Sequence, residues 1–536
     1  MQHRPLCWVF LAVGFALAID ASPVPFRFEE ATIEGLQVEM AAGRLTAQEL
    51  TGAYLQRIAE IDRAGPMLRA VIEVNPDALA IAAQLDVERK AGKVRGPLHG
   101  IPVLLKDNIA TLDRMETTAG SLALVGAKPP GDAFLVKRLR EAGAVILGKT
   151  NLSEWALFRD GKGRSGWSAR GGQTLNPYAL DLSPAGSSSG SAVAVAANLC
   201  VVAVGTETDG SILSPASVCG IVGIKPTVGL VSRSGVIPIS ISQDTPGVMA
   251  RTVRDAALLL EVLAASDPRD SATGIRARPS AFDFTAAPHS HALKGARIGV
   301  VTGPFGFDEK HSAQLNRTVA ELQAAGAVIA CSGEFPAFNG LDEPEREVLL
   351  YEFKDGINRY LATLGPASPV KSLADLIAYN EAHAATEMPY FKQEIFLRAQ
   401  EKGPLTDPVY RVAVKTCRRI ARGGIDVLMK EYRLDALVTL TGSVAWRIDR
   451  GAGGPAVANS AQPAAVAGYP SVTVPAAQLD GLPVGLSFFG RPWSEARLLD
   501  LAADFEARTR ARRGPQFLRH GPTSMQAVDR DRRPLF

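Results

Sequence analysis

The chain has 536 residues, of which 46% are hydrophobic and 21% are charged. This is the composition of a folded globular protein, and it excludes a disordered chain or a coiled coil. The formal net charge is +3, from 58 basic and 55 acidic residues that are interspersed, which argues against nucleic acid as the main partner. Because no Ser-, Gly- or Pro-rich linker clearly divides the chain, the sequence predicts one large domain.

The N-terminus has the pattern of a secretory signal peptide. Arg4 precedes an apolar run from Leu6 to Ile19, and small residues follow at Ala21 and Ser22. We expect cleavage after Ala21, so that residues 1–21 direct export to the periplasm or the medium and 22–536 form the mature domain. The apolar run is short for a transmembrane helix, although an uncleaved anchor remains the alternative.

The four cysteines of the mature chain are widely separated: Cys200, Cys219, Cys331 and Cys417. Their spacing matches neither a dense disulfide framework nor a metal site. Buried free thiols are expected, with one disulfide as the alternative, and no metal is expected.

The first mature elements alternate between helix and strand. Apolar residues from Ile33 to Met40 and a capping box from Thr46 to Glu49 predict two helices. Ile101–Leu105 then predicts a strand that ends at Lys106, and Ala133–Glu141 predicts a helix. Ala144–Leu147 returns to strand, and this alternation is typical of an α/β fold.

The pattern continues toward the C-terminus. A charged stretch over about 345–432 predicts a helical insertion over the sheet, and Asp480-Gly481 predicts a hairpin turn. The other predicted elements are a helix at Ala192–Leu199, a strand at Val201–Val204, a strand at Ile298–Val301, a helix at Ala313–Ala325, strands at Ala327–Ala330, Ala436–Leu440 and Ser471–Val474, and a helix at Ser494–Arg508.

A polar, Gly-rich and aromatic stretch from Glu154 to Tyr178 is too long for a simple connection. It is interpreted as a loop beside the active site, and an ordinary surface excursion is the alternative.

Two Ser/Gly loops flank the helix and strand predicted over 192–204: Ala185-Gly-Ser-Ser-Ser-Gly-Ser191 and Gly205-Thr-Glu-Thr-Asp-Gly-Ser211. By itself each loop is typical of a flexible turn or an anion-binding nest. A nucleophilic serine needs a base within hydrogen-bond reach, and the mature histidines have no obvious partner. The first loop also matches the nucleophile elbow G-x-S-x-G with Ser188 as nucleophile, but no apolar strand precedes it.

Three pieces in this order resemble the amidase signature family. They are Gly96-Pro-Leu-His-Gly-Ile-Pro-Val-Leu-Leu-Lys-Asp-Asn108, the first Ser/Gly loop, and Gly205–Pro215 with Gly220–Pro226. The likeness runs from about Ala31 to Arg510, with a Ser-Ser-Lys core over about 96–232. Within the family the chain is most similar to bacterial peptide amidases, by both Ser/Gly loops, Val228-Gly-Leu-Val-Ser-Arg and Gln243-Asp-Thr-Pro. The resemblance implies a central mixed sheet with helices on both faces.

The resemblance assigns Lys106 as base, Ser187 as bridging serine and Ser211 as the serine that becomes acylated. The physical chemistry agrees, because a lysine acts as a base only when neutral, and burial behind an apolar strand lowers its pKa. The family also implies a cis peptide between Gly186 and Ser187. It implies an oxyanion hole from the backbone amides of Thr208, Asp209, Gly210 and Ser211. Ser188 and Gly186 are expected to support the loop, and no cofactor is expected.

Two departures from the common pattern are visible. Many members carry arginine two residues after the nucleophile, whereas this chain has Leu213, which puts the transfer of a detailed substrate pocket in doubt. The first loop also reads Gly-Ser-Ser-Ser-Gly-Ser rather than Gly-Gly-Ser-Ser-Gly-Gly. Neither change removes a member of the triad.

The resemblance implies a serine amidohydrolase that cleaves a primary carboxamide, the C-terminal amide of peptides, to the acid and ammonia. A general aryl or acyl amidase or esterase on small amides is the first alternative. An amidotransferase component that passes ammonia to a charged transfer RNA is the second, and a non-catalytic binding protein is the third. A monomer is expected, acting on a small-molecule or short peptide amide without stable membrane insertion.

Overall fold

The structure is a computed structural model that describes residues 26–275, 283–284, 291–335, 338–448 and 458–522; the predicted signal peptide, 1–21, lies outside these ranges. One large sheet crosses the described chain. Its strands are β1 (Val71–Val74), β2 (Pro102–Lys106), β3 (Val145–Thr150), β6 (Val202–Glu207), β7 (Val222–Lys225), β8 (Thr245–Ala250), β9 (Arg297–Gly303), β10 (Val328–Glu334), β11 (Ala436–Leu440), β12 (Ser471–Leu479) and β13 (Leu482–Phe489). A small separate hairpin joins β4 (Trp167–Ser168) and β5 (Gly172–Gln173).

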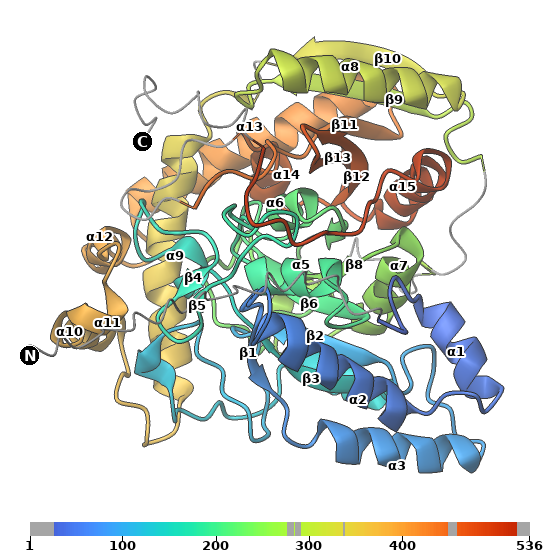
Figure 1. Cartoon of the computed structure of the whole chain (residues 1–536). Helices are drawn as coiled ribbons and strands as arrows, with labels where there is room; N and C mark the ends of the chain where they lie inside the picture. Colours follow the sequence, from blue (N-terminus) through green and yellow to red (C-terminus); the bar gives the residue numbers. More distant parts are fainter. Residues whose placement is uncertain (1–25, 276–282, 285–290, 336–337, 449–457, 523–536) are drawn as a thin grey trace, which may run out of the picture.

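The strand order in the large sheet is β1-β3-β2-β6-β8-β7-β12-β13-β11-β9-β10. β3, β2 and β6 are parallel, and so are β10, β9 and β11, whereas the other neighbours are antiparallel. The sheet is therefore mixed, as expected. Figure 1 shows it extending from the blue N-terminal strands to β9 and β10 at the opposite end.

Helices cover both faces of this sheet. Their bounds are α1 (Ile33–Ala41), α2 (Ala47–Arg57), α3 (Ala78–Lys90), α4 (Phe134–Glu141), α5 (Ser189–Ala196), α6 (Leu213–Val218), α7 (Val253–Leu263), α8 (Glu309–Ala324), α9 (Asp342–Thr363), α10 (Leu373–Ala382), α11 (Ala384–Glu387), α12 (Glu394–Gln400), α13 (Pro408–Glu431), α14 (Gln462–Ala467) and α15 (Glu495–Thr509). The pair α5 and α6 packs on one face of the central strands, and α4, α7 and α15 pack together on the other. The described residues form one domain with an α/β fold.

Most of the predicted elements are confirmed, with ends that move by a few residues. The capping box is present, with the Thr46 side chain accepting from the Glu49 amide and the Glu49 carboxylate accepting from the Thr46 amide. The hairpin turn is also present, because Asp480 and Gly481 take φ values of 51° and 80° between β12 and β13. The predicted helical insertion corresponds to α9–α13; Figure 1 shows α10, α11 and α12 at the left edge of the molecule, whereas α13 lies beside α14.

The start of α5 differs from the prediction. The helix begins at Ser189 rather than at Ala192, so part of the first Ser/Gly loop is helical. This helical part is closely packed: a Cβ atom at Gly190 would lie 2.3 Å from the carbonyl oxygen of Ala70 and 2.5 Å from that of Asn151. This glycine permits a backbone contact, where the sequence suggested flexibility.

The long stretch from Glu154 to Tyr178 contains the β4–β5 hairpin but is otherwise mostly irregular, and much of it is buried. Arg159 is fully buried and forms ion pairs with Glu154 and, at 3.8 Å, with Glu387 of α11. The Arg159 guanidinium also lies 4.2 Å from the ring centroid of Phe391. This buried cluster fastens the helical insertion to the stretch, which is therefore part of the domain interior.

Candidate active site

The buried strand β2 carries Lys106 at its carboxyl end. All five residues of the strand are buried, and Lys106 has no exposed surface. Its Nζ atom lies 2.8 Å from the Oγ atom of Ser187, 2.9 Å from Oγ1 of Thr206 and 3.2 Å from the Thr206 carbonyl oxygen. Since β2 and β6 are parallel neighbours, their ends meet at the same edge of the sheet, which brings Lys106 and Thr206 together.

Ser187 lies in the loop that leads into α5. The peptide bond between Gly186 and Ser187 is cis, as the family resemblance implies. Ser187 is completely buried, and Gly186 allows the loop to pack tightly, because a Cβ atom there would lie 2.2 Å from the Oγ atom of Ser153. The loop thus holds the Ser187 hydroxyl against the Lys106 amine.

The Ser188 side chain hydrogen-bonds to the backbone of β6. Its hydroxyl is buried, donates to the Thr206 carbonyl oxygen at 3.0 Å and accepts from the Thr206 amide at 3.2 Å. Both bonds tie the first Ser/Gly loop to β6. The nucleophile-elbow hypothesis for Ser188 is therefore not supported, because its hydroxyl is engaged with backbone and turned away from solvent.

Ser211 ends the second Ser/Gly loop, between β6 and α6. Its carbonyl oxygen accepts a hydrogen bond of 3.1 Å from the Ser188 amide, so the two Ser/Gly loops lie side by side. Ser211 keeps 8% of its surface exposed, whereas Ser187 and Lys106 keep none. Among these three residues, Ser211 is the one that solvent reaches.

The backbone around Ser211 is held by two residues of its own loop. Gly210 has φ +75°, and a Cβ atom there would lie 2.6 Å from the Asn459 side chain, so the position favours glycine. Glu207 accepts hydrogen bonds from the amides of Ile212 and Leu213 at 2.7 and 3.0 Å. Together they fix the turn that presents Ser211.

Burial dominates the electrostatics of the site. It lowers the pKa of Lys106 to about 7, although the charges of Glu207 and Asp244 act in the opposite direction. Burial also raises the pKa of Asp209 well above its ordinary value, and the nearby Glu345 carboxylate adds to this effect. Lys106 is thus poised to exist as a neutral amine near neutral pH.

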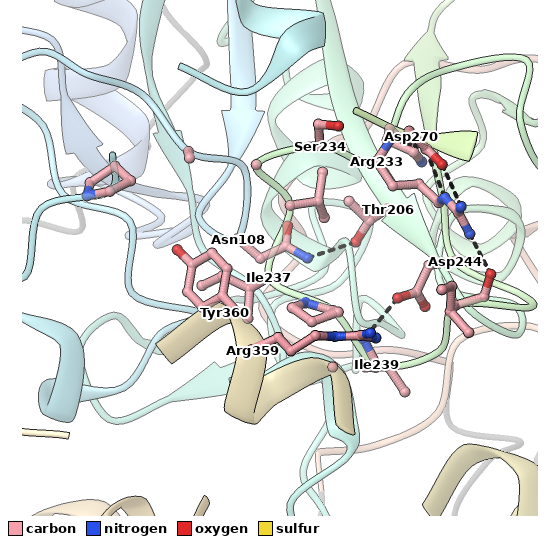
Figure 2. Close-up of a pocket in the computed structure, with 18 of the residues that line it drawn as sticks. Asn108, Thr206, Arg233, Ser234, Ile237, Ile239, Asp244, Asp270, Arg359 and Tyr360 are labelled. Atoms are coloured by element: carbon pink, nitrogen blue, oxygen red, sulfur yellow. Dashed lines mark hydrogen bonds and ion pairs between the residues drawn. The ribbon is translucent and has the colours of Figure 1, made fainter. Parts of the chain in front are cut away.

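A cavity of about 600 Å³ opens from this site, and Ser187, Asn108, Thr206 and Thr208 line its inner part. An apolar wall includes Ile237, Ile239 and the ring of Tyr360, and Figure 2 shows these residues around the cavity. The outer part carries charged groups, among them Arg233 and Asp270, which form an ion pair. Ala156 of the long buried stretch also lines the cavity, which agrees with the interpretation of a loop beside the active site.

Several residues that the structure places at this site were not predicted from the sequence. Thr206 contacts the Lys106 amine, and Asn108 donates to the Thr206 hydroxyl at 2.9 Å. Glu207 holds the turn after Ser211, and Asp244 lines the cavity. All four residues stand inside motifs that carry the family resemblance, so position in a motif was a signal for them, but sequence spacing does not reveal these contacts.

Within the described residues, no group of three or more His, Cys, Asp and Glu side chains is arranged to hold a metal ion. The four described cysteines are free thiols; Cys200, Cys219 and Cys417 are buried and Cys331 is half-buried. None of the described helices is long and apolar enough to cross a membrane.

Comparison with known proteins supports the same family. The family model described as Amidase matches residues 49–499. A probable amidase of Arabidopsis thaliana is 43% identical, over 95% of this chain and 96% of that protein. The native peptide amidase of Stenotrophomonas maltophilia is 54% identical, with a TM-score of 0.88 over 92% of this chain and 100% of that one.

A glutamyl-tRNA(Gln) amidotransferase subunit from Symbiobacterium thermophilum is 37% identical, over 88% of this chain and 95% of that protein. The match of the family model across most of the chain, together with relatives that align along nearly their whole length, means that this chain belongs to the amidase family and is an amidase.

Proposed function

We propose that this amidase hydrolyses the C-terminal amide of peptides to the free acid and ammonia through an acyl-enzyme. The observation that carries the proposal is the 54% identity and TM-score of 0.88 to the peptide amidase of Stenotrophomonas maltophilia over 92% of the chain. The cavity of about 600 Å³ has a size that fits a short peptide rather than a folded protein. Its apolar wall at Ile237 and Ile239 suits a side chain next to the scissile amide.

In this proposal Ser211 is the nucleophile, Ser187 relays the proton and Lys106 is the base. The hydrogen bonds of Lys106 support the role of the base. A neutral amine has two N–H donors and one lone pair, and its contacts are the Thr206 carbonyl and hydroxyl oxygens and the Ser187 hydroxyl. If the two oxygens of Thr206 accept, the lone pair is left for the Ser187 proton.

The proposed reaction forms an acyl-enzyme and then hydrolyses it. Ser211 Oγ bonds to the amide carbon while its proton passes to Ser187, and the Ser187 proton passes to Lys106. The C–N bond then breaks, and the proton returns along the same path to the leaving nitrogen, which departs as ammonia. Water then bonds to the ester carbon while its proton passes through Ser187 to Lys106. The bond between this carbon and Ser211 Oγ breaks, and the proton returns to Ser211 Oγ, which releases the acid and restores the serine.

The charge on the carbonyl oxygen needs donors that are already in place. We assign this role to the backbone amides of Thr208, Asp209, Gly210 and Ser211, which form the loop directly before and at the nucleophile. The positive φ of Gly210 supports this assignment, since it turns the backbone sharply at the residue before Ser211. The bonds from Glu207 to the next two amides keep the loop in place before substrate binds.

Two further expectations belong to the same proposal. The pattern of Arg4, the apolar run to Ile19 and the small Ala21 supports export through a cleaved signal peptide. A monomer is sufficient for the reaction, because Lys106, both serines and the cavity lie within one chain.

A second candidate function is that of an amidotransferase component, which the 37% identity to the Symbiobacterium thermophilum protein favours. That role requires partner proteins to receive the ammonia. A general amidase on small aryl or acyl amides is the other alternative, since it uses the same hydroxyl and amine groups with a different acyl pocket.

The test is ammonia release from C-terminally amidated dipeptides and from small aryl amides, with the wild type and Ser211→Ala. Release from the peptides that depends on Ser211 supports the proposal. Release from the aryl amides alone keeps the triad and rejects the peptide substrate. Release that persists in Ser211→Ala rejects the nucleophile, and release only with added partner proteins supports the second candidate.

A further inference from the structure

The Gln243-Asp-Thr-Pro motif has no assigned role in the proposed reaction. Gln243 and Asp244 directly precede β8, which pairs antiparallel with β6, so that Thr245 stands opposite Glu207. This register puts the motif beside the loop that continues from β6 to Ser211. The motif therefore lies next to the amides proposed to bind the carbonyl oxygen.

The Asp244 carboxylate joins two separate segments. One oxygen accepts a hydrogen bond of 2.6 Å from the Thr208 hydroxyl. The other oxygen accepts from the amides of Ile239 and Ser240, both at 2.8 Å. One side chain thus connects the Ser211 loop with the 237–241 segment, which forms part of the cavity wall (Figure 2).

The Gln243 side chain contacts the backbone of Thr208. Its side-chain amide donates to the Thr208 carbonyl oxygen at 3.3 Å and to the Glu345 carboxylate of α9 at 2.7 Å. The other Glu345 oxygen accepts from the Gln462 side chain of α14 at 2.8 Å. Thr208 is consequently fixed at both its hydroxyl and its carbonyl by adjacent residues of one motif.

We propose that Asp244 is a positioning residue for amide hydrolysis, which sets the loop from Thr208 to Ser211 at a fixed distance from the substrate wall at Ile239. The proposal rests on the function proposed above. A carboxylate suits this task because it accepts three hydrogen bonds from two segments at once, and charge-assisted bonds are stronger and shorter than neutral ones. Misplacement of the loop by about 1 Å is enough to lower turnover about 100-fold.

The charge of Asp244 has a second effect that a purely structural role lacks. After burial, the largest influences on the Lys106 pKa are the negative charges of Glu207 and Asp244, and both raise it. Burial raises the pKa of the Asp244 carboxyl to about 6, against the hydrogen bonds from Thr208, Ile239 and Ser240 and the charge of Arg233, which lower it. Loss of the Asp244 charge therefore lowers the Lys106 pKa, and the acid limb of activity moves to lower pH.

The experiment compares Asp244→Asn, Asp244→Ala and Thr208→Val in the full chain, with ammonia release measured from an amidated dipeptide between pH 5 and 9. Asn keeps the shape of the side chain: its oxygen accepts from the two backbone amides, and its NH₂ group faces the Thr208 hydroxyl, which is able to accept. Asp62→Asn is the matched control, because Asp62 also accepts from two backbone amides, at Ala70 and Val71, and also has a pKa of about 6, but it does not line the cavity.

We expect Asp244→Ala to lower kcat about 100-fold with little change in KM. Asp244→Asn should lower kcat less than about tenfold and should shift the acid limb of the pH profile to lower pH. Asp62→Asn should leave both kcat and the acid limb unchanged. Thr208→Val should follow Asp244→Ala, and the double variant should be no slower than the slower single variant, because both remove the same bond.

Wild-type kcat in Asp244→Ala overturns the proposal, and so do additive losses in the double variant or an unmoved acid limb in Asp244→Asn. If Asp244→Ala does not fold, Asp244→Asn and Thr208→Val carry the test. Ser211→Ala separates the two proposals: if it stays active, the proposed mechanism fails, whereas if it is inactive and the Asp244 variants match the wild type, only the positioning role fails.

Discussion

The pKa of Lys106 leads to a quantitative prediction for the pH dependence of activity. The amine works as a base only when neutral, and burial places its pKa at about 7. The neutral fraction is then about 0.09 at pH 6 and about 0.9 at pH 8, so kcat/KM should rise about tenfold between these values and level off above pH 8. An ordinary lysine, with a pKa of about 10.4, would give a rise of about 100-fold with no plateau in this range.

The assay is ammonia release from an amidated dipeptide at low substrate concentration, between pH 5.5 and 9.5, with the Ser211→Ala rate subtracted. Lys149 provides the matched control, because it is also a fully buried amine, with a pKa of about 8 and hydrogen bonds of 2.8 Å to Ile109 and Thr117. Lys149→Met should leave the midpoint unchanged, whereas Lys106→Met should abolish activity. A rate that still rises tenfold per pH unit at pH 9 would refute the reasoning that burial neutralises Lys106.

Three other substitutions test separate parts of the structure. Ser187→Ala should lower kcat by about 10² to 10⁴ without weakening substrate binding, since it interrupts the proton path, and steady-state kinetics would show this; an unchanged kcat contradicts the relay. Glu207→Ala should lower kcat and also the melting temperature, because two buried amides after Ser211 lose their acceptor at a loss of about 1–3 kcal/mol each; a melting curve like that of the wild type counts against this view. Arg159→Met should destabilise the fold by about 3–5 kcal/mol, because it leaves buried carboxylates without their cation, and urea unfolding measures this; a loss below about 1 kcal/mol would show that the cluster does not fasten the insertion.

Local patterns in the sequence were sufficient for much of the fold. The capping box from Thr46 to Glu49 marks a helix start, and Asp480-Gly481 marks a hairpin, because each signal depends on residues within a single turn. The apolar run that ends at Lys106 also predicted a strand correctly, because β2 is buried along its full length and its sequence is therefore continuously apolar up to the lysine.

The proposed triad came from motif resemblance rather than from spacing. Lys106 and Ser187 are 81 residues apart, and only the parallel packing of β2 beside β6 and the loop before α5 brings them to 2.8 Å. From the residues alone, the Ser/Gly loops were more typical of flexible turns or anion-binding nests than of a catalytic site. The resemblance supplied the three residues, and the structure supplies the geometry of the contact between Lys106 and Ser187.

The residues around the triad were decided by the tertiary structure. Thr206 contacts Lys106 across 100 positions of sequence, and Asp244 contacts Thr208 across 36. The cavity wall formed by α9 likewise depends on how the helical insertion packs, and no local pattern records that packing. The sequence by itself determined the helices and strands and, through family motifs, the side chains proposed for catalysis. The order of the strands and the packing of α9 decided which side chains meet. The physical reason is that hydrogen bonds between distant segments exist only after the strands have paired.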